Sequence, residues 1–200
     1  MSSYGQCHLP TPWGTANTVD EEAEGILFAS TPSHGGFFVI KERLKEIQPA
    51  LRNLGIHRDG GAWFEEDVLW AVVAVTWPDI FSASALTIAH ETLKNCHPLE
   101  YEVAFNVTLD LSESRVKRQM ALNQAHKDDL IVVCAWGDWD EHTPIGMVRV
   151  LAYRGGRLEN GNYPDDQEPR HFLVPSDEYR AGKTEIGFIV NTEKHQETLL

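Results

Sequence analysis

The most constraining feature of this sequence is a change in its pattern near residue 130. From there on, short apolar runs alternate with segments rich in Gly, Asp, Asn and Pro. Short runs separated by turn-forming residues are typical of antiparallel sheets. We therefore predict an antiparallel sheet in the C-terminal part of the chain, with a long polar loop over Gly155–Pro169. The predicted strands are Leu130–Trp136, Ile145–Tyr153, Arg170–Val174 and Ile186–Asn191.

The sequence before residue 126 has a mainly helical pattern. Apolar residues at helical spacing, together with capping residues and prolines, predict its helices. The run Trp63–Trp77 has three acids near its start and is otherwise almost wholly apolar. A strand competes there, but we favour a buried helix that ends before Pro78, because acids in a first turn complement the helix dipole. The predicted helices are Lys41–Leu54 with an interruption near Pro49, Trp63–Trp77, Ser82–Asn95 and Ser112–His126, with a loop at Gly55–Gly61.

Two strand predictions complete the N-terminal part. Gly25–Thr31 and Phe37–Ile40 flank a Gly-rich turn, which predicts a hairpin with His34 at its tip. Tyr101–Leu109 alternates like a half-exposed strand. The fold class is therefore α+β, with helices mainly before residue 126 and an antiparallel sheet after it. We expect a single α+β domain over residues 1–200, and a subdivision into an α/β lobe (1–100) and a β-rich lobe (101–200) stays open.

The charge of the chain limits its partners. Thirty acids against 17 Lys and Arg give a net charge of −13. Binding of duplex nucleic acid over the whole surface is thereby disfavoured, because such binding depends on Lys and Arg. An acidic enzyme, a partner of basic proteins, or a competitor of nucleic acid for a basic cleft all remain open.

The cysteines and the apolar runs indicate the compartment. Cys7, Cys96 and Cys134 are odd in number and widely spaced, which suits reduced thiols. No signal peptide is evident, and no stretch approaches the roughly 18 consecutive apolar residues of a membrane span. We expect a cytoplasmic protein that makes no membrane contact.

The sequence lacks the common catalytic motifs, which favours a protein that is not an enzyme. Gly182-Lys183-Thr184 lacks the earlier glycine of a phosphate-binding loop, since Asp177 stands in its place. Nucleophile elbows, metalloprotease helices and dinucleotide fingerprints are also missing, so we expect no cofactor. If the protein is an enzyme, its candidate catalytic residues are His34, Glu65 and Glu66. A histidine beside two glycines suits acid–base chemistry near an oxyanion, although the same residues also suit a plain turn.

One acidic segment, Gly137–His142, is a weak metal candidate. In an extended loop Asp138, Asp140 and His142 would point to one side, and carboxylates with an imidazole can bind a divalent cation. An acidic hairpin loop that keeps the sheet edges in solution is the better explanation of these residues, so no metal is predicted. The neighbouring Trp136 and Trp139 are expected to be packing anchors.

Three short motifs suggest a family. They are Thr11-Pro12-Trp13-Gly14, Ser33-His34-Gly35-Gly36, and Trp63-Phe64-Glu65-Glu66-Asp67. With them the chain resembles an uncharacterised domain family of plasmid-, phage- and mobile-element-encoded bacterial proteins. The resemblance implies a mobile-element origin but carries over no catalytic residue.

Small acidic proteins of mobile elements resemble inhibitors of host defence. The resemblance implies an anti-CRISPR or anti-restriction protein that binds a host defence protein or ribonucleoprotein with a basic cleft. An enzyme, either a hydrolase or a transferase, that uses His34 with a nearby carboxylate is one alternative, and a structural accessory protein of the element is another. The candidate binding carboxylates of the inhibitor are Asp20, Glu21, Glu22, Glu24, Asp138, Asp140, Glu141, Asp165, Asp166 and Glu168.

Overall fold

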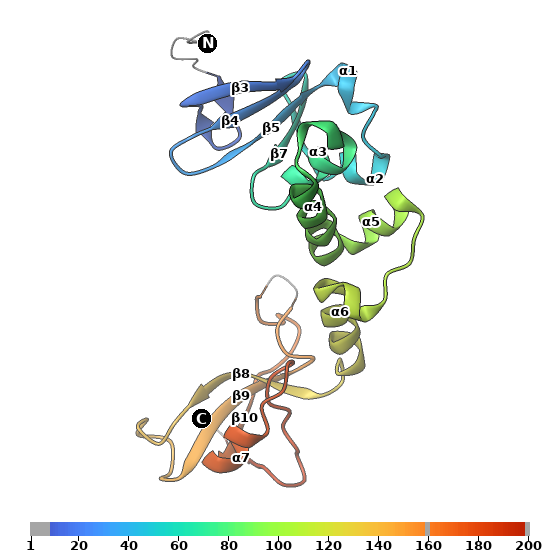
Figure 1. The fold of residues 1–200 in the computed structure, drawn as a ribbon. Coiled ribbons are helices and arrows are strands. Elements are labelled where there is room, and N and C mark those ends of the chain that lie inside the picture. Colours follow the sequence, from blue (N-terminus) through green and yellow to red (C-terminus); the bar gives the residue numbers. More distant parts are fainter. Residues whose placement is uncertain (1–8, 159–160, 199–200) are drawn as a thin grey trace. The chain divides into compact units, whose positions relative to one another are not determined.

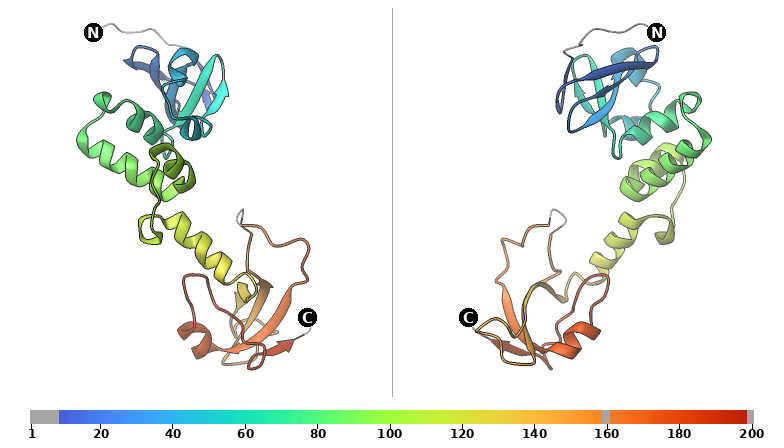
Figure 2. Two further views of the ribbon diagram at one scale, coloured as in Figure 1. Left: turned by 90° about the vertical axis from the view of Figure 1, so that its right-hand side faces the viewer. Right: turned by 60° about the vertical axis from the view of Figure 1, so that its left-hand side comes forward.

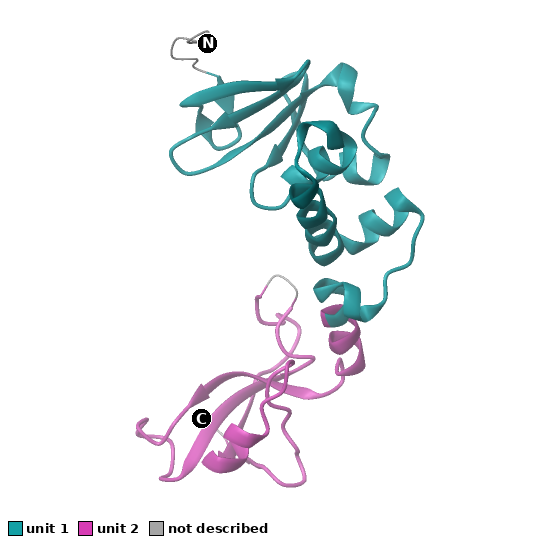
Figure 3. Cartoon of the chain, viewed as in Figure 1, with its two compact units in different colours: residues 1–118 teal, residues 119–200 magenta. Residues whose placement is uncertain are grey.

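The computed structural model describes residues 9–158 and 161–198 and confirms an α+β fold (Figure 1). Cys7 lies outside the described residues. The chain divides into two compact units, residues 1–118 and 119–200 (Figure 3). The boundary falls inside helix α6 (Arg115–Ala125). Each unit has its own sheet and its own apolar core.

Five antiparallel strands form the main sheet in the described part of unit 1, in the order β3-β4-β5-β7-β6. Strands β4 and β5 confirm the predicted hairpin, and His34 lies in the turn between them. A further hairpin, β1 (Pro10–Thr11) with β2 (Gly14–Thr15), precedes the sheet. The strands of the sheet are β3 (Thr18–Ala23), β4 (Ile26–Ser30), β5 (Gly35–Ile40), β6 (Ile56–Arg58) and β7 (Gly61–Glu65).

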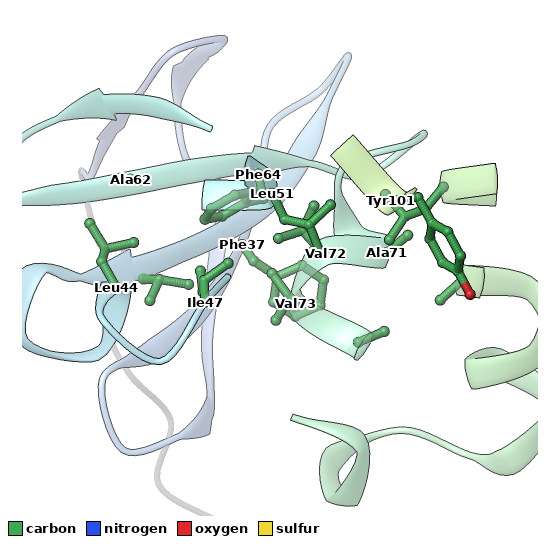
Figure 4. Close-up of a cluster of buried hydrophobic side chains, with 14 of the residues drawn as sticks. Phe37, Leu44, Ile47, Leu51, Ala62, Phe64, Ala71, Val72, Val73 and Tyr101 are labelled. Atoms are coloured by element: carbon green, nitrogen blue, oxygen red, sulfur yellow. The ribbon is translucent and has the colours of Figure 1, made fainter. Parts of the chain in front are cut away.

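Side chains alternate along the strands of this sheet, so neighbouring residues point to opposite faces. Side chains on both faces are packed against other parts of unit 1. Phe37 and Phe64 point to one face and join the helices in the main core (Figure 4). Phe38 and Trp63 belong to the other face, where Trp13 packs on them. Trp13 thus anchors the described part of the N-terminal segment on this face.

The helices of unit 1 follow from local capping and from proline. Pro49 opens α2, which confirms the predicted interruption of the helix over residues 41–54. The Ser82 side chain caps α4 by accepting the Ala85 N–H at 3.2 Å. Asn106 ends α5 in the left-handed conformation. The helices are α1 (Lys41–Leu44), α2 (Pro49–Arg52), α3 (Trp70–Thr76), α4 (Ala83–Cys96) and α5 (Pro98–Phe105), with single turns η1 (Pro78–Ile80) and η2 (Leu111–Glu113). Figure 2 shows them from two further sides.

Three predictions in unit 1 were wrong. Residues 63–65 are strand rather than helix, because they pair with β5 and bury alternate side chains on both faces of the sheet. Residues 55–61 contain β6 and a turn at Asp59-Gly60, where both residues have positive φ. Tyr101–Leu109 begins as helix, because α5 continues to Phe105; the Tyr101 and Phe105 rings, one helical turn apart, pack in a tilted arrangement with centroids 4.5 Å apart.

Unit 2 contains the predicted C-terminal antiparallel sheet, in the order β11-β10-β9-β8. The first three predicted strands are confirmed. The fourth, Ile186–Asn191, was wrong: it makes an isolated bridge from Ile189 to β8, and the chain then turns back at Asn191 to form β11. The elements are β8 (Leu130–Trp136), β9 (Met147–Arg154), β10 (Arg170–Pro175), α7 (Ser176–Ala181) and β11 (Gln196–Thr198).

None of the helices within residues 9–158 and 161–198 combines the length and the apolar character that a bilayer span requires.

Candidate functional site

Three motifs that lie apart in the sequence meet on one face of the unit 1 sheet. The Trp13 ring makes edge contacts with Trp63, at 5.8 Å between centroids, and with His34, at 6.1 Å. A Cβ atom added at Gly36 would lie 2.4 Å from Trp13 Cη2 and 2.6 Å from the Phe64 carbonyl oxygen. Only glycine therefore allows Trp13 to pack this closely on β5.

The His34 side chain is held by its own turn. Its Nδ1 lies 2.7 Å from the Ser33 carbonyl oxygen, which can only accept, so Nδ1–H is the donor. Thr31 Oγ1 accepts the His34 N–H at 3.1 Å and donates to the His34 carbonyl at 2.7 Å. The remaining ring nitrogen, Nε2, lies 3.9 Å from Asp67 Oδ2, and the two side chains are 44% and 71% exposed.

The two candidate catalytic glutamates bind backbone groups instead of His34. Glu66 accepts the Gly35 N–H at 2.7 Å and so ties the turn before β5 to the end of β7. Glu65 accepts the N–H groups of Val68 and Leu69 at 2.7 and 2.8 Å, just before α3. The carboxylate that lies within 4 Å of a His34 ring nitrogen is that of Asp67, which is not among the catalytic candidates named from the sequence. Asp67 stands in the same acidic run as the glutamates, and this proximity in sequence was the available signal.

Four candidate binding carboxylates lie together at an edge of the unit 1 sheet. Strand β3 is an edge strand, and a register shift between Glu21 and Ala23 leaves Glu22 at a bulge. Bulges re-aim side chains, which accounts for three consecutive exposed acids. Among the described residues none of the four carboxylates forms an ion pair. They are Asp20, Glu21, Glu22 and Glu24.

The loop between β8 and β9, residues 137–146, has a fixed conformation. Asp140 Oδ1 accepts hydrogen bonds from Arg149 at 3.0 Å, from the His142 N–H at 3.1 Å and from Thr143 Oγ1 at 3.3 Å. Asp138 Oδ2 accepts the Gly146 N–H at 3.2 Å and so closes the loop. Burial opposes ionisation of Asp140, but these hydrogen bonds outweigh it and lower the pKa of this carboxyl.

The same loop displays two large apolar side chains. Trp139 is 78% exposed and Ile145 is 94% exposed. Trp139 is therefore no packing anchor, which corrects the sequence-based expectation. Exposed acids, Asp138 and Glu141, accompany these apolar side chains.

The metal candidates of this loop do not form a ligand set. Consecutive turns, with Asp140 N–H bonded to Gly137 O and Thr143 N–H to Asp140 O, replace the extended backbone that would align the three side chains. The Asp140 carboxylate is paired with Arg149, and His142 Nε2 lies 3.4 Å from Glu141 Oε1. Within the described ranges no group of three or more His, Cys, Asp or Glu side chains could hold a metal ion.

A buried polar cluster supports the loop from inside unit 2. Arg149 is 7% exposed, and its guanidinium lies 4.5 Å from the Trp136 ring centroid. Trp136 also stacks on His171, so it is the packing anchor that the sequence predicted. Burial, and next the charge of Arg149, lower the pKa of His171. Arg149 Nε and His171 Nδ1 are buried and have no hydrogen-bond partner among the described residues.

The remaining candidate binding residues lie in the loop between β9 and β10. Asp165, Asp166 and Glu168 are exposed, and among the residues described they form no ion pair. Nine of the ten candidate binding carboxylates are therefore exposed. The tenth, Asp140, is half-buried and accepts a hydrogen bond from Arg149.

The geometry defines an α+β protein whose three N-terminal motifs form one packed face. A family model described as "Domain of unknown function (DUF7007)" matches residues 6–127. The chain belongs to this family, and the match contains all three motifs. No curated protein and no solved structure matches the chain.

Proposed function

We propose that this protein binds a basic cleft of a host nucleic-acid-targeting defence complex and inhibits it, as an anti-CRISPR or anti-restriction protein of a mobile element. The loop of residues 137–146 is the observation that carries the proposal. It combines an exposed tryptophan and isoleucine with exposed carboxylates in a conformation that the protein itself fixes.

The apolar side chains of this loop suit a protein partner. Tryptophan is among the residues most enriched at binding hot spots, and burying apolar area contributes about 25 cal/mol per Å². Trp139 and Ile145 are already held outward by a loop that Asp140 and Arg149 order. Binding therefore requires little further loop ordering, which otherwise opposes association.

The carboxylates determine the charge of the partner. Asp138 and Glu141 in unit 2, and the acids of β3 in unit 1, have no intramolecular ion pair with Lys or Arg among the residues described. Unpaired surface charge steers association toward a surface of opposite sign, and the resulting rate falls with salt. A cleft lined with Lys and Arg, of the kind that holds a nucleic-acid backbone, is the matching partner.

The test is inhibition of purified CRISPR effector and restriction complexes, measured as DNA cleavage with and without the protein. We expect the wild-type chain to inhibit at least one complex, and the double variant Trp139→Ala/Ile145→Ala to lose at least about tenfold in potency. The matched control is Ile88→Ala/Leu99→Ala, which removes two exposed apolar side chains from unit 1.

A charge test uses the pair Asp138→Asn/Glu141→Gln, which keeps side-chain shape, against Glu42→Gln/Asp79→Asn at exposed sites elsewhere. We expect the first pair alone to weaken inhibition and flatten its salt dependence. Failure of the wild-type chain to inhibit any complex of the panel would overturn the inhibitor proposal. Tight binding without inhibition would instead support an accessory role for the element.

A second candidate is an enzyme, and the approach of Asp67 to His34 favours it. A carboxylate near Nε2 can orient a histidine for proton transfer if it closes from 3.9 Å to hydrogen-bond distance. The test is His34→Ala beside Asp67→Asn. If the protein is an enzyme, both variants should fold normally and lose the biological activity that the wild-type chain shows. A variant that keeps the full activity of the wild-type chain removes this candidate.

A further inference from the structure

A basic cavity opens at the surface of unit 1 of this acidic protein. Its volume is about 460 Å³, and it is bounded by α1, α2 and the turn between β6 and β7. Figure 1 marks α1, α2 and β7 in this unit. The cavity is lined by Lys41, Leu44, Lys45, Arg52, His57, Arg58, Asp59, Gly60 and Gly61.

The charges of this lining are mostly unbalanced. Four Lys or Arg side chains face one carboxylate, and that carboxylate, Asp59, pairs with Arg58 at 2.6 Å. Lys41, Lys45 and Arg52 make no ion pair with any residue described by the structure. Three cations around one cavity repel one another, and a bound anion relieves that repulsion. Such an arrangement is unexpected in a chain that has 30 acids and only 17 Lys and Arg.

The cavity walls are fixed by backbone contacts. The Lys41 N–H donates to the Gly60 carbonyl at 3.0 Å, which joins α1 to the β6–β7 turn. The His57 ring lies 3.0 Å from the Arg52 carbonyl through Nε2, which must be the donor, so this bond joins β6 to the end of α2. A Cβ atom at Gly61 would lie 2.2 Å from the Val39 carbonyl, so a glycine is needed where the turn approaches β5. The cations are thus presented by a preformed scaffold rather than by a free tail.

We propose that this cavity binds a compact phosphorylated small molecule. Its volume lies within the roughly 300–1,000 Å³ typical of small-molecule sites. Lysine and arginine are the usual phosphate ligands in proteins, and three unpaired cations match a group with more than one negative charge. An extended nucleic acid fits less well, because the cations surround one cavity and the rest of the chain carries excess negative charge that repels a polyanion.

The experiment is isothermal titration of the full chain with inorganic pyrophosphate, ADP and a short DNA duplex at low salt. We expect pyrophosphate and ADP to bind and the duplex not to bind. Lys45→Glu should weaken pyrophosphate binding at least about tenfold. The matched control Lys127→Glu makes the same charge change at an exposed lysine of unit 2 and should leave the affinity unchanged.

Stronger binding of ADP than of pyrophosphate would assign a nucleotide, and equal binding would assign the phosphate groups alone. Lys45 is exposed, so Lys45→Glu should keep the wild-type melting temperature, and Arg52→Gln offers a second variant with the same expected loss. The proposal is overturned if neither phosphate compound binds, if both charge reversals weaken binding equally, or if only the duplex binds.

Discussion

The packing of Trp13 on β5 gives a sharp stability prediction for Gly36→Ala. The new methyl group would lie 2.4 Å from Trp13 Cη2, 2.8 Å from Trp13 Cζ3 and 2.6 Å from the Phe64 carbonyl oxygen. Separations this short require atoms to move. The carbonyl belongs to β7, whose strand is paired with β5 at this point, so it moves little. The displacement therefore falls mainly on the Trp13 side chain.

The expected loss of stability combines three effects. Overpacking costs about 1–3 kcal/mol, and loss of the aromatic contact between Trp13 and Trp63 adds about 0.5–1.5 kcal/mol. The lower backbone entropy of unfolded alanine offsets about 0.4–1 kcal/mol. Gly36→Ala should thus destabilise unit 1 by about 0.5–4 kcal/mol, equivalent to several degrees in melting temperature near the middle of that range. Urea unfolding followed by tryptophan fluorescence measures it.

A double-variant cycle separates the clash with Trp13 from any other effect. If Trp13 takes up the displacement, Gly36→Ala should cost clearly less in a Trp13→Ala background than in the wild-type chain. Equal costs in the two backgrounds would place the strain on the Phe64 carbonyl alone. A Gly36→Ala variant as stable as the wild type would refute the reasoning altogether.

Three further predictions concern stability. Phe64→Ala should cost about 3–5 kcal/mol in urea unfolding, because Phe64 is fully buried, whereas Leu99→Ala at an exposed site should change stability by less than about 0.5 kcal/mol. Gly60→Ala should cost about 1 kcal/mol from its positive φ alone, since no atom lies within 4 Å of the added Cβ; a neutral result would contradict the turn geometry. Burial lowers the pKa of His90 and of His171, so below about pH 6.5 the unfolded chain binds more protons than the folded chain, and stability should fall as the pH drops. Thermal melts from pH 7.5 to 5.5 check this fall, which should be shallower in His90→Gln/His171→Gln.

The segments that were predicted correctly are those whose structure is decided locally. The β4–β5 hairpin has turn residues between two apolar runs, and β8, β9 and β10 are bounded by residues that interrupt strands. The segment 63–65 was predicted wrongly because its structure depends on pairing with β5, which lies 25 or more residues earlier. Its apolar sequence alone fits a buried helix equally well. The Asp59-Gly60 turn was recognisable, since Asp-Gly is a strong hairpin signal, but β6 before it has only three residues.

The candidate site was only partly predictable for a related reason. The acids of β3 and of the 165–168 segment are exposed as composition suggests, because nothing nearby in sequence pairs with them. The role of Asp140 depends on Arg149, which reaches it only because β9 follows the loop with its side chain directed inward. Side chains two residues apart, such as those of Asp138 and Asp140, point to the same side only where the backbone is extended. The loop that holds them is built of turns, so this alternation does not apply there.

Net charge therefore says less about binding than the pairing state of each charged group. Asp140 counts toward the −13 but faces a buried arginine, so it stabilises a loop and offers nothing to a partner. Asp138 and Glu141 beside it are exposed, and the same charge in their position is available for association. The cations differ in the same way: Lys117 is bound to Glu102 and to the Leu109 carbonyl, whereas Lys45 lines a cavity and forms no ion pair among the residues described. The two proposals therefore rest on different charged groups of one chain: the basic cleft is proposed for the unpaired acids, and the small phosphorylated ligand is proposed for the unpaired cations.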